Sequence, residues 1–326
     1  MDDRHDTLSS GADIRFRYLA TDALELPAGL EFRYDGAEST KIDSRSRYHA
    51  GAYAAPVLAV SQGLKVSPSV RLDWYDDYPA GLTYSLGASA AVSEAVTLKA
   101  TAGRSYRAPA FNDLYWPLEV YDYGIEGYRM WGNPNLLPET SWYAEAGAVF
   151  TDGTLSASVS VFSRYTEDLI TWSSSFDGYW YDSTPENLAA AAFFGADTEA
   201  YLQSGPLSVS AYYALLLSYD LSSGNTLADE VRVANQPVHA VRLESSYSFG
   251  TMKVLARMSW KSEYADPFGN TLHPAVLLGA RIQYEATDSM HVYLDGENLL
   301  NQANAEMKDY PMPGITLKAG VRIVLD

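Results

Sequence analysis

The chain has 326 residues, no cysteine, a net charge of -18 and an aromatic content dominated by 25 tyrosines. The lack of cysteine excludes a disulfide framework and thiolate metal sites, and the acidic balance argues against a nucleic-acid partner, because phosphate binding needs a basic surface. The aromatic residues suit either a membrane–water interface or an aromatic-rich soluble sheet.

The N-terminus, Met1 to Asp6, is charged and lacks the apolar core of a signal peptide. It leaves two alternatives open, a start that is not the native one or a cytosolic protein. Further along, no run approaches the roughly 20 apolar residues of a membrane-spanning helix. The longest apolar run, Leu188 to Ala196, is too short.

Apolar and polar residues alternate with a period of two along most of the chain. The pattern is clear at 155–161, 207–218, 239–249, 252–260 and 315–325, and it predicts strands with one apolar and one polar face. We expect about fifteen such segments of about ten residues, which is the length that crosses a bilayer at a tilt. The apolar face often carries alanine beside larger apolar residues. A lipid environment tolerates this mixture of sizes better than a close-packed protein core does.

The connections between these segments alternate between long and short. Long connections are expected at 106–140, 167–186, 220–236, 261–272 and 297–313, and tight turns at 93–95, 151–154, 203–206, 249–251 and 285–289. Long loops on one rim and short turns on the other are typical of membrane barrels. The sequence therefore predicts an all-β, antiparallel up-and-down transmembrane β-barrel of roughly 14–16 strands. A generic soluble all-β protein is the alternative.

Three stretches carry a family resemblance. They are Arg104–Trp116, Gly132–Ser141 and Gly296–Asn301, and together they resemble the TonB-dependent outer-membrane receptors of the cobalamin and siderophore type. We expect the matching positions to have a structural role, because they combine residues typical of turns with residues that end strands. These positions are Arg107, Pro109, Leu114, Tyr115, Gly132, Asn133, Pro134, Leu136, Pro138, Glu139, Asn298 and Leu299. Since Arg107 and Glu139 flank the same connection, we also expect an ion pair between them.

The resemblance implies a barrel of 22 strands with a plugged lumen. Compared with the family's barrel, this chain has no counterpart for about seven strands, the plug, the N-terminal partner-binding segment and an aromatic last residue. We therefore expect residues 1–326 to be the C-terminal portion of a receptor barrel, from an N-terminally truncated or split product. An odd strand count would place Met1 outside the cell. The expected partners are outer-membrane lipid, a small-molecule chelate, and TonB only through the missing region.

No catalytic motif is recognisable, and we expect neither an enzyme, nor a cofactor, nor a metal site. The five histidines are not spaced as ligand pairs. Glu199, Glu244, Asp295 and Glu297 lie on polar strand faces, where we expect them to line the lumen.

Candidate ligand contacts lie in two aromatic clusters of the long connections. They are Tyr121, Tyr123, Tyr128 and Trp131 in the first, and Trp172, Phe176, Tyr179, Trp180 and Tyr181 in the second. Aromatic rings beside polar groups suit a sugar, a corrinoid or a chelate, and the nearby carboxylates are of the type that binds Ca²⁺. The alternative is that these rings pack the loops or form the interfacial belt.

The sequence thus favours an outer-membrane receptor for uptake of a scarce nutrient such as an iron–siderophore or cobalamin. Two alternatives remain open: a passive porin-like or structural barrel, and a soluble all-β carbohydrate-binding protein. The second predicts that the apolar faces meet each other across a dry two-layer core.

Overall fold

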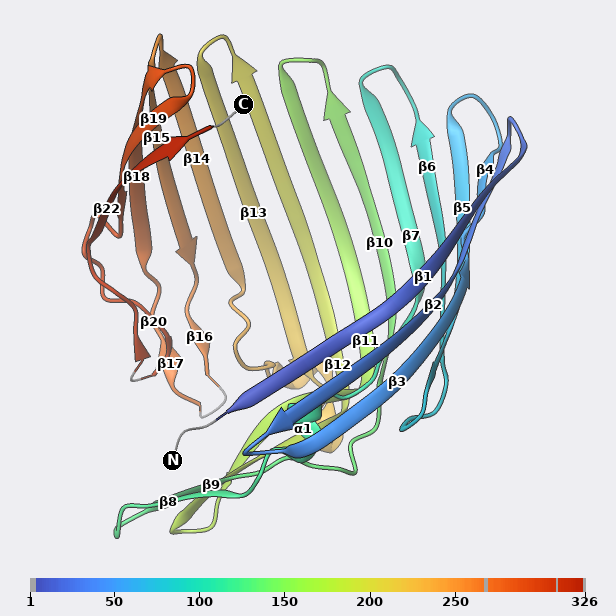
Figure 1. Ribbon diagram of the computed structural model, residues 1–326, viewed down its shortest axis with the longest axis vertical. Helices are drawn as coiled ribbons and strands as arrows, with labels where there is room; N and C mark the ends of the chain where they lie inside the picture. Colours follow the sequence, from blue (N-terminus) through green and yellow to red (C-terminus); the bar gives the residue numbers. More distant parts are fainter. Residues whose placement is uncertain (1–3, 267–268, 309, 325–326) are drawn as a thin grey trace.

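The computed structural model describes residues 4–266, 269–308 and 310–324, so both ends of the expected barrel segment 1–326 lie outside it. It contains one 18-stranded sheet curved into an open wall, with the smaller elements at one rim (Figure 1). The wall strands are β1 (His5–Thr21), β2 (Leu24–Ser39), β3 (Asp43–Ala54), β4 (Val57–Ala59), β5 (Leu64–Tyr75), β6 (Gly81–Ala91), β7 (Val96–Arg107), β10 (Glu139–Thr151), β11 (Leu155–Phe176), β12 (Trp180–Ser204), β13 (Leu207–Asp220), β14 (His239–Phe249), β15 (Met252–Lys261), β18 (Val276–Thr287), β19 (Met290–Glu297) and β22 (Thr316–Ile323).

Short elements lie in the long connections. They are α1 (Phe111–Tyr115), β8 (Glu119–Asp122), β9 (Gly127–Met130), the 3₁₀ turns η1 (Ser222–Gly224) and η2 (Leu227–Asp229), β16 (Tyr264–Ala265), β17 (Thr271–Leu272), β20 (Ala305–Met307) and β21 (Tyr310–Pro311). Within the described ranges, no helix is long and apolar enough to cross a membrane.

β3 and β4 share one position in the wall, because each pairs with both β2 and β5. The other consecutive wall strands pair antiparallel, from β1 with β2 through to β19 with β22. This confirms the predicted up-and-down order. β1 and β22 form the two edges and run in the same direction, because an even number of antiparallel steps separates them. The described residues include no pairing between these two strands, so the wall is open there (Figure 1).

The two faces of the wall differ as the alternation predicts. On β5, Trp74 is 50% exposed, whereas its neighbour Asp73 is only 7% exposed. The polar side chains converge: Arg71 on β5 reaches over β3 to Glu31 on β2, with 3.0 Å between Nη2 and Oε2. Side chains converge on the concave face of a curved sheet, so two of them can meet there over an intervening strand. The polar face is therefore the inner one, and among the residues that the structure describes no second layer covers the outward apolar face, in contrast to a sandwich.

Aromatic rings mark both ends of the outer face. Near the long connections, Trp142 lies beside Tyr165 with 6.3 Å between ring centroids. Near the tight turns, Tyr247 lies beside Phe249 at 4.7 Å. Two aromatic girdles flanking an apolar band are the pattern of membrane barrels.

The tight turns lie where the sequence predicts them, including the turn at Gly153, which has a φ of 88°. One expected connection is wrong. Residues 167–186 do not form a long loop, because β11 continues to Phe176 and β12 begins at Trp180. The two strands extend past the rim as a hairpin, since their ladder runs without a break in pairing from Leu169 with Leu188 to Phe176 with Tyr181.

Candidate ligand-binding loops at the long-connection rim

The tip of the β11–β12 hairpin is a turn fixed by a carboxylate. Oδ1 of Asp177 accepts hydrogen bonds from the backbone nitrogens of Tyr179 at 2.9 Å and Trp180 at 2.7 Å. These two bonds lower the pKa of Asp177 below its usual value, because they stabilise the ionised form. Gly178 supplies the positive φ of 107° that the turn requires.

A second loop adds its backbone to this hairpin. β9 pairs parallel with the start of β12, from Gly127 with Trp180 to Met130 with Ser183, and β8 pairs antiparallel with β9. A Cβ atom at Gly127 would overlap the Trp180 ring, so the close approach needs glycine. Two loops distant in sequence thus extend the main sheet beyond the wall, and we call this extension, formed by β8, β9 and the start of β12, the small sheet (Figure 1).

This sheet brings members of both predicted aromatic clusters together. The Tyr181 ring stacks on Phe176 at 4.4 Å and on Tyr128 at 5.0 Å, and Tyr123 meets Tyr128 edge-on at 6.0 Å. We call Tyr123, Tyr128, Tyr181 and Phe176 the ring row. Tyr123 is 66% exposed and Phe176 54%, so both ends of the row are open. The rings pack the loops, and they also present open aromatic surface.

The other predicted ring residues lie outside the row. Tyr179 and Trp180 contact each other edge-on at 5.2 Å. Tyr121 donates its hydroxyl to Glu119 at 3.0 Å. Trp172 donates its indole nitrogen to Asp113 at 3.3 Å, and Trp131 is tied to the hairpin through its backbone nitrogen. Trp172 and Trp131 thus hold the loops against each other.

Ion pairs hold the small sheet. Nε and Nη2 of Arg129 donate to the two carboxylate oxygens of Asp182, both at 2.6 Å, and the guanidinium lies 4.9 Å from the Trp180 ring centre. This two-point geometry is the strong form of an arginine–carboxylate pair. Nearby, Lys41 binds Glu119 and lowers the pKa of that carboxyl group.

The base of the loops is formed by two of the resemblance segments. Arg107 Nε donates to Glu139 at 2.7 Å, which confirms the predicted ion pair, and Glu139 also accepts from the backbone nitrogen of Ile170 at 2.8 Å. Leu114 and Leu136 are each only 2% exposed. Both segments therefore take part in the packing at the base of the loops.

Gly132 and Asn133 lock the loop onto α1. The backbone nitrogen of Gly132 donates to the Trp116 carbonyl, and that of Asn133 to the Asp113 carbonyl, each at 2.8 Å. The Asn133 side chain also donates to the Pro185 carbonyl at 3.1 Å, which reaches the β11–β12 hairpin. A Cβ at Gly132 would lie 2.6 Å from the Trp116 nitrogen, so the packing leaves no room for a side chain.

Asn298 has the same type of role in the third segment. Its Nδ2 donates to the carbonyls of Gln302 at 3.0 Å and Pro313 at 3.2 Å, and its Oδ1 accepts from the Gln302 nitrogen at 3.0 Å. Leu299 donates its backbone nitrogen to Leu278 at 2.8 Å. The segment thus closes the connection between β19 and β22.

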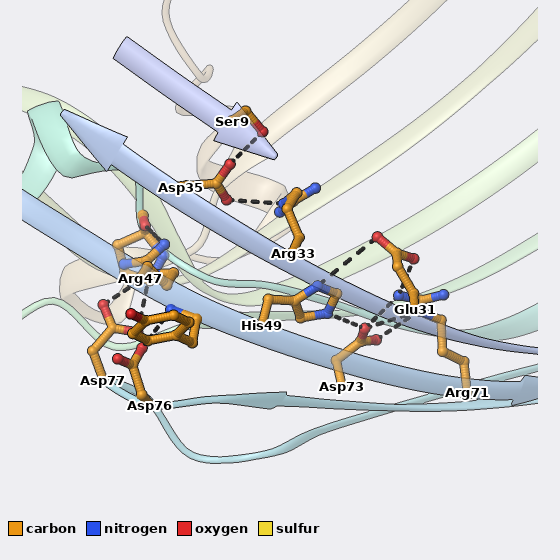
Figure 2. A network of polar contacts seen from close by, with 12 residues as sticks. Ser9, Glu31, Arg33, Asp35, Arg47, His49, Arg71, Asp73, Asp76 and Asp77 are labelled. Atoms are coloured by element: carbon orange, nitrogen blue, oxygen red, sulfur yellow. Dashed lines mark hydrogen bonds and ion pairs between the residues drawn. The ribbon is translucent and has the colours of Figure 1, made fainter. Parts of the chain in front are cut away.

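Sequence reasoning missed a buried polar network on the inner wall of β2, β3 and β5, which we call the wall network (Figure 2). His49 Nε2 lies 2.7 Å from Asp73 Oδ1, and Arg71 Nε donates to both oxygens of Asp73 at 2.9 Å. Arg71 also donates to Glu31. The available signal was a spacing of two between ionisable residues on one face of each strand: Glu31, Arg33 and Asp35 on β2, Arg45, Arg47 and His49 on β3, and Arg71 and Asp73 on β5.

Arg47 links this wall to the loop base. It donates from Nη1 to the Pro109 carbonyl at 2.9 Å and from Nε to Asp77 at 2.7 Å (Figure 2). The Tyr78 and Phe111 rings lie 5.1 and 5.0 Å from its guanidinium. Burial raises the pKa of Tyr78 to about 12. Arg47 therefore fixes the first resemblance segment against β3.

The predicted lumen charges lie on the inner face. Asp295 is buried and accepts from Arg257 at 2.6 Å and from Arg281 at 2.5 Å. Glu199, Glu244 and Glu297 line a hollow of about 790 Å³ on the same face. In the described part of the chain, no group of three or more His, Asp or Glu residues is arranged to hold a metal ion.

Comparison with known proteins identifies relatives. Residues 2–299 match the family model described as TonB dependent receptor-like, beta-barrel. The vitamin B12 transporter BtuB of Vibrio vulnificus strain YJ016 is 26% identical over 278 residues, which cover 84% of this chain and 42% of that protein. The chain thus spans less than half the length of this relative.

Solved structures show the same fold. The siderophore receptor PirA of Acinetobacter baumannii superposes with a TM-score of 0.76 at 17% identity, over 98% of this chain and 55% of that one. The copper transporter OprC gives 0.79 at 14% identity, over 98% and 57%.

Proposed function

The chain belongs to the TonB-dependent receptor β-barrel family, and from this we propose that it forms the wall and the ligand-binding loops of an outer-membrane receptor for a scarce nutrient. The nutrient class is an iron–siderophore, cobalamin or a similar chelate. The observation that carries the proposal is the ring row, which two loops build at one rim of the wall and which is open at both ends. Concave rims with aromatic rings and a few fixed polar groups suit such ligands.

The proposal assigns a role to each surface. The rim with the long connections faces the cell exterior, the apolar outer face contacts lipid, and the polar inner face lines the lumen. We propose that the chain corresponds to the C-terminal barrel portion of such a receptor. Contact with TonB then requires a plug region, which residues 4–324 do not include.

The test measures ligand binding with cyanocobalamin and a ferric siderophore as probes, using the full chain. Tyr181→Ala removes an inner ring of the row, so the end ring Phe176 loses its stacking partner, a contact of about 0.5–1.5 kcal/mol. We expect binding of the correct probe to weaken about twofold to tenfold, because Phe176 is then no longer held in place. Tyr247→Ala, on the outer face near the tight turns, is the matched control and should leave binding unchanged.

Two outcomes would count against a receptor. One is that neither probe binds. The other is a large conductance in planar bilayers that does not respond to either probe, which would support a passive pore.

A further inference from the structure

We propose that the ring row accepts a ligand that is uncharged or cationic and has a flat unsaturated face, and that it rejects polyanionic chelates. This inference rests on the proposed function and specifies its substrate class. It combines three observations: the open ring faces, the engagement of the nearby cations by carboxylates, and the excess of carboxylates in the two loops.

The open ring faces favour positive or neutral ligands. Tyr123 and Phe176 end the row with more than half of their surfaces exposed. An aromatic face carries the negative part of the ring quadrupole, so it attracts cations and stacks with flat apolar plates, but it repels anions. A ligand extending the row would meet such a face at either end.

The cations beside the row already hold carboxylates. Arg129 binds both oxygens of Asp182 and lies 3.7 Å from Asp177, so its charge is balanced from two sides. Lys41, at the base of β8, binds Glu119. Receiving an anionic ligand at either cation would require breaking a charge-assisted contact first.

The two loops carry many more carboxylates than cations. Residues 108–138 contain Arg129 as their one basic residue, and residues 167–187 contain no lysine or arginine. The acidic residues are Asp113, Glu119, Asp122, Glu126, Glu167, Asp168, Asp177, Asp182 and Glu186. A rim of one sign of charge focuses the field on an approaching ligand.

This field separates ligands by charge. A carboxylate without a counterion that lies about 10 Å from the ligand in water changes the ligand's affinity roughly twofold for each unit of ligand charge. This figure applies in the absence of salt screening. Several carboxylates acting on a ligand with several negative charges therefore multiply to a strong rejection, whereas an uncharged ligand experiences no net penalty.

The experiment uses the full chain in detergent and three flat rings of similar size: 1-methylnicotinamide, which is cationic, nicotinamide, which is neutral, and nicotinate, which is anionic. Dissociation constants are measured by ligand-observed NMR at about 0.01 M and about 0.3 M salt, where screening is weak and strong. We expect affinity to fall from the cation to the neutral ring to the anion, and the difference to shrink at high salt.

Glu126→Lys tests the cause. Glu126 lies between Tyr123 and Gly127, and its carbonyl accepts from the Tyr123 nitrogen at 3.0 Å. The substitution should lower the cation-to-anion affinity ratio on the order of tenfold at low salt. Asp288→Lys makes the same charge change at the opposite rim, in the exposed turn after β18, and should leave the ratio unchanged.

The outcomes separate the two proposals. If the rings bind but nicotinate binds as tightly as the cation, or if the ratio is insensitive to Glu126→Lys, the charge preference is wrong and the receptor proposal stands. If none of the three rings binds and Tyr181→Ala does not affect cyanocobalamin or siderophore binding, both proposals are wrong.

Discussion

The wall network and the ring row differ both in the kind of side chain they use and in how far that side chain is buried. In the wall network, Asp73 accepts hydrogen bonds from Arg71 and contacts His49 on the inner face, and His49 and Asp73 are buried (Figure 2). In the ring row, Tyr123 and Phe176 remain largely exposed. Removing one partner from a buried charged network leaves the others without compensation, whereas removing an exposed ring leaves a surface that water can cover. The wall should therefore determine stability and the row should determine recognition.

The strongest test of this contrast is Asp73→Ala. The substitution leaves Arg71 and His49 without their shared acceptor, so we expect a loss of about 3–5 kcal/mol in the free energy of unfolding. Unfolding in guanidinium chloride, monitored by tryptophan fluorescence, measures this loss of stability. Asp73→Asn keeps the shape and one acceptor oxygen and should cost less. A loss below about 1 kcal/mol for Asp73→Ala would show that the wall network is dispensable.

Gly132→Ala tests the loop base that connects the two regions. A Cβ there would lie 2.6 Å from the Trp116 nitrogen and 2.8 Å from the Leu114 carbonyl carbon, so the backbone must shift. We expect a loss of about 1–3 kcal/mol, together with weaker ligand binding, because the loops lose their anchor. Gly87→Ala is the matched control, since the nearest atom to its Cβ would be 3.6 Å away. Equal effects of the two substitutions would contradict this assignment.

Tyr181→Ala should affect stability much less than either change. Its half-buried ring contacts Phe176 and Tyr128 at the rim, so we expect a loss of about 1 kcal/mol in unfolding and a larger relative loss in ligand affinity. The same unfolding measurement, together with a ligand-binding titration of the same variant, tests whether affinity falls more than stability. A stability loss as large as that of Asp73→Ala would remove the distinction between wall and row.

The smallest expected effect is a pH dependence at the rim. The pKa of Glu119 is lowered from 4.5, first by its hydrogen bond with Lys41. The stabilisation is therefore fully present above pH 4.5 and is lost as the pH falls through the lower pKa of the folded chain. Glu119→Gln should remove this acid-sensitive contribution, as measured by unfolding between about pH 3 and pH 6. An unchanged profile would mean that the Lys41 contact contributes nothing.

The sequence predicts the wall better than the rim. Alternation along 252–260 is a local signal, and β15 (Met252–Lys261) and its outward apolar face follow from it. The Arg107–Glu139 pair was also predictable, because both residues end strands that flank one connection. In contrast, the pairing of β9 with β12 joins residues about fifty positions apart in parallel, and no local pattern signals it.

The β11–β12 hairpin illustrates why the rim was missed. Serines occupy 173–175 and aromatic residues 179–181, so the apolar alternation that identifies the wall strands is absent there. In the structure these residues form strands because each contacts a partner across the hairpin, as Phe176 contacts Tyr181. The Arg71–Glu31 contact needed the curvature of the sheet, which a strand pattern alone does not provide.

The distance between the two aromatic girdles also gives the height of the apolar band on the outer face. On β10, Trp142 and Phe150 are eight residues apart, which at about 3.3 Å per residue and a tilt of about 40° corresponds to roughly 20 Å along the membrane normal. A thick bilayer would have to compress to match so short a band, and this mismatch costs free energy. The bacterial outer membrane is thinner than average, so the height of the wall itself favours that location over a thicker membrane.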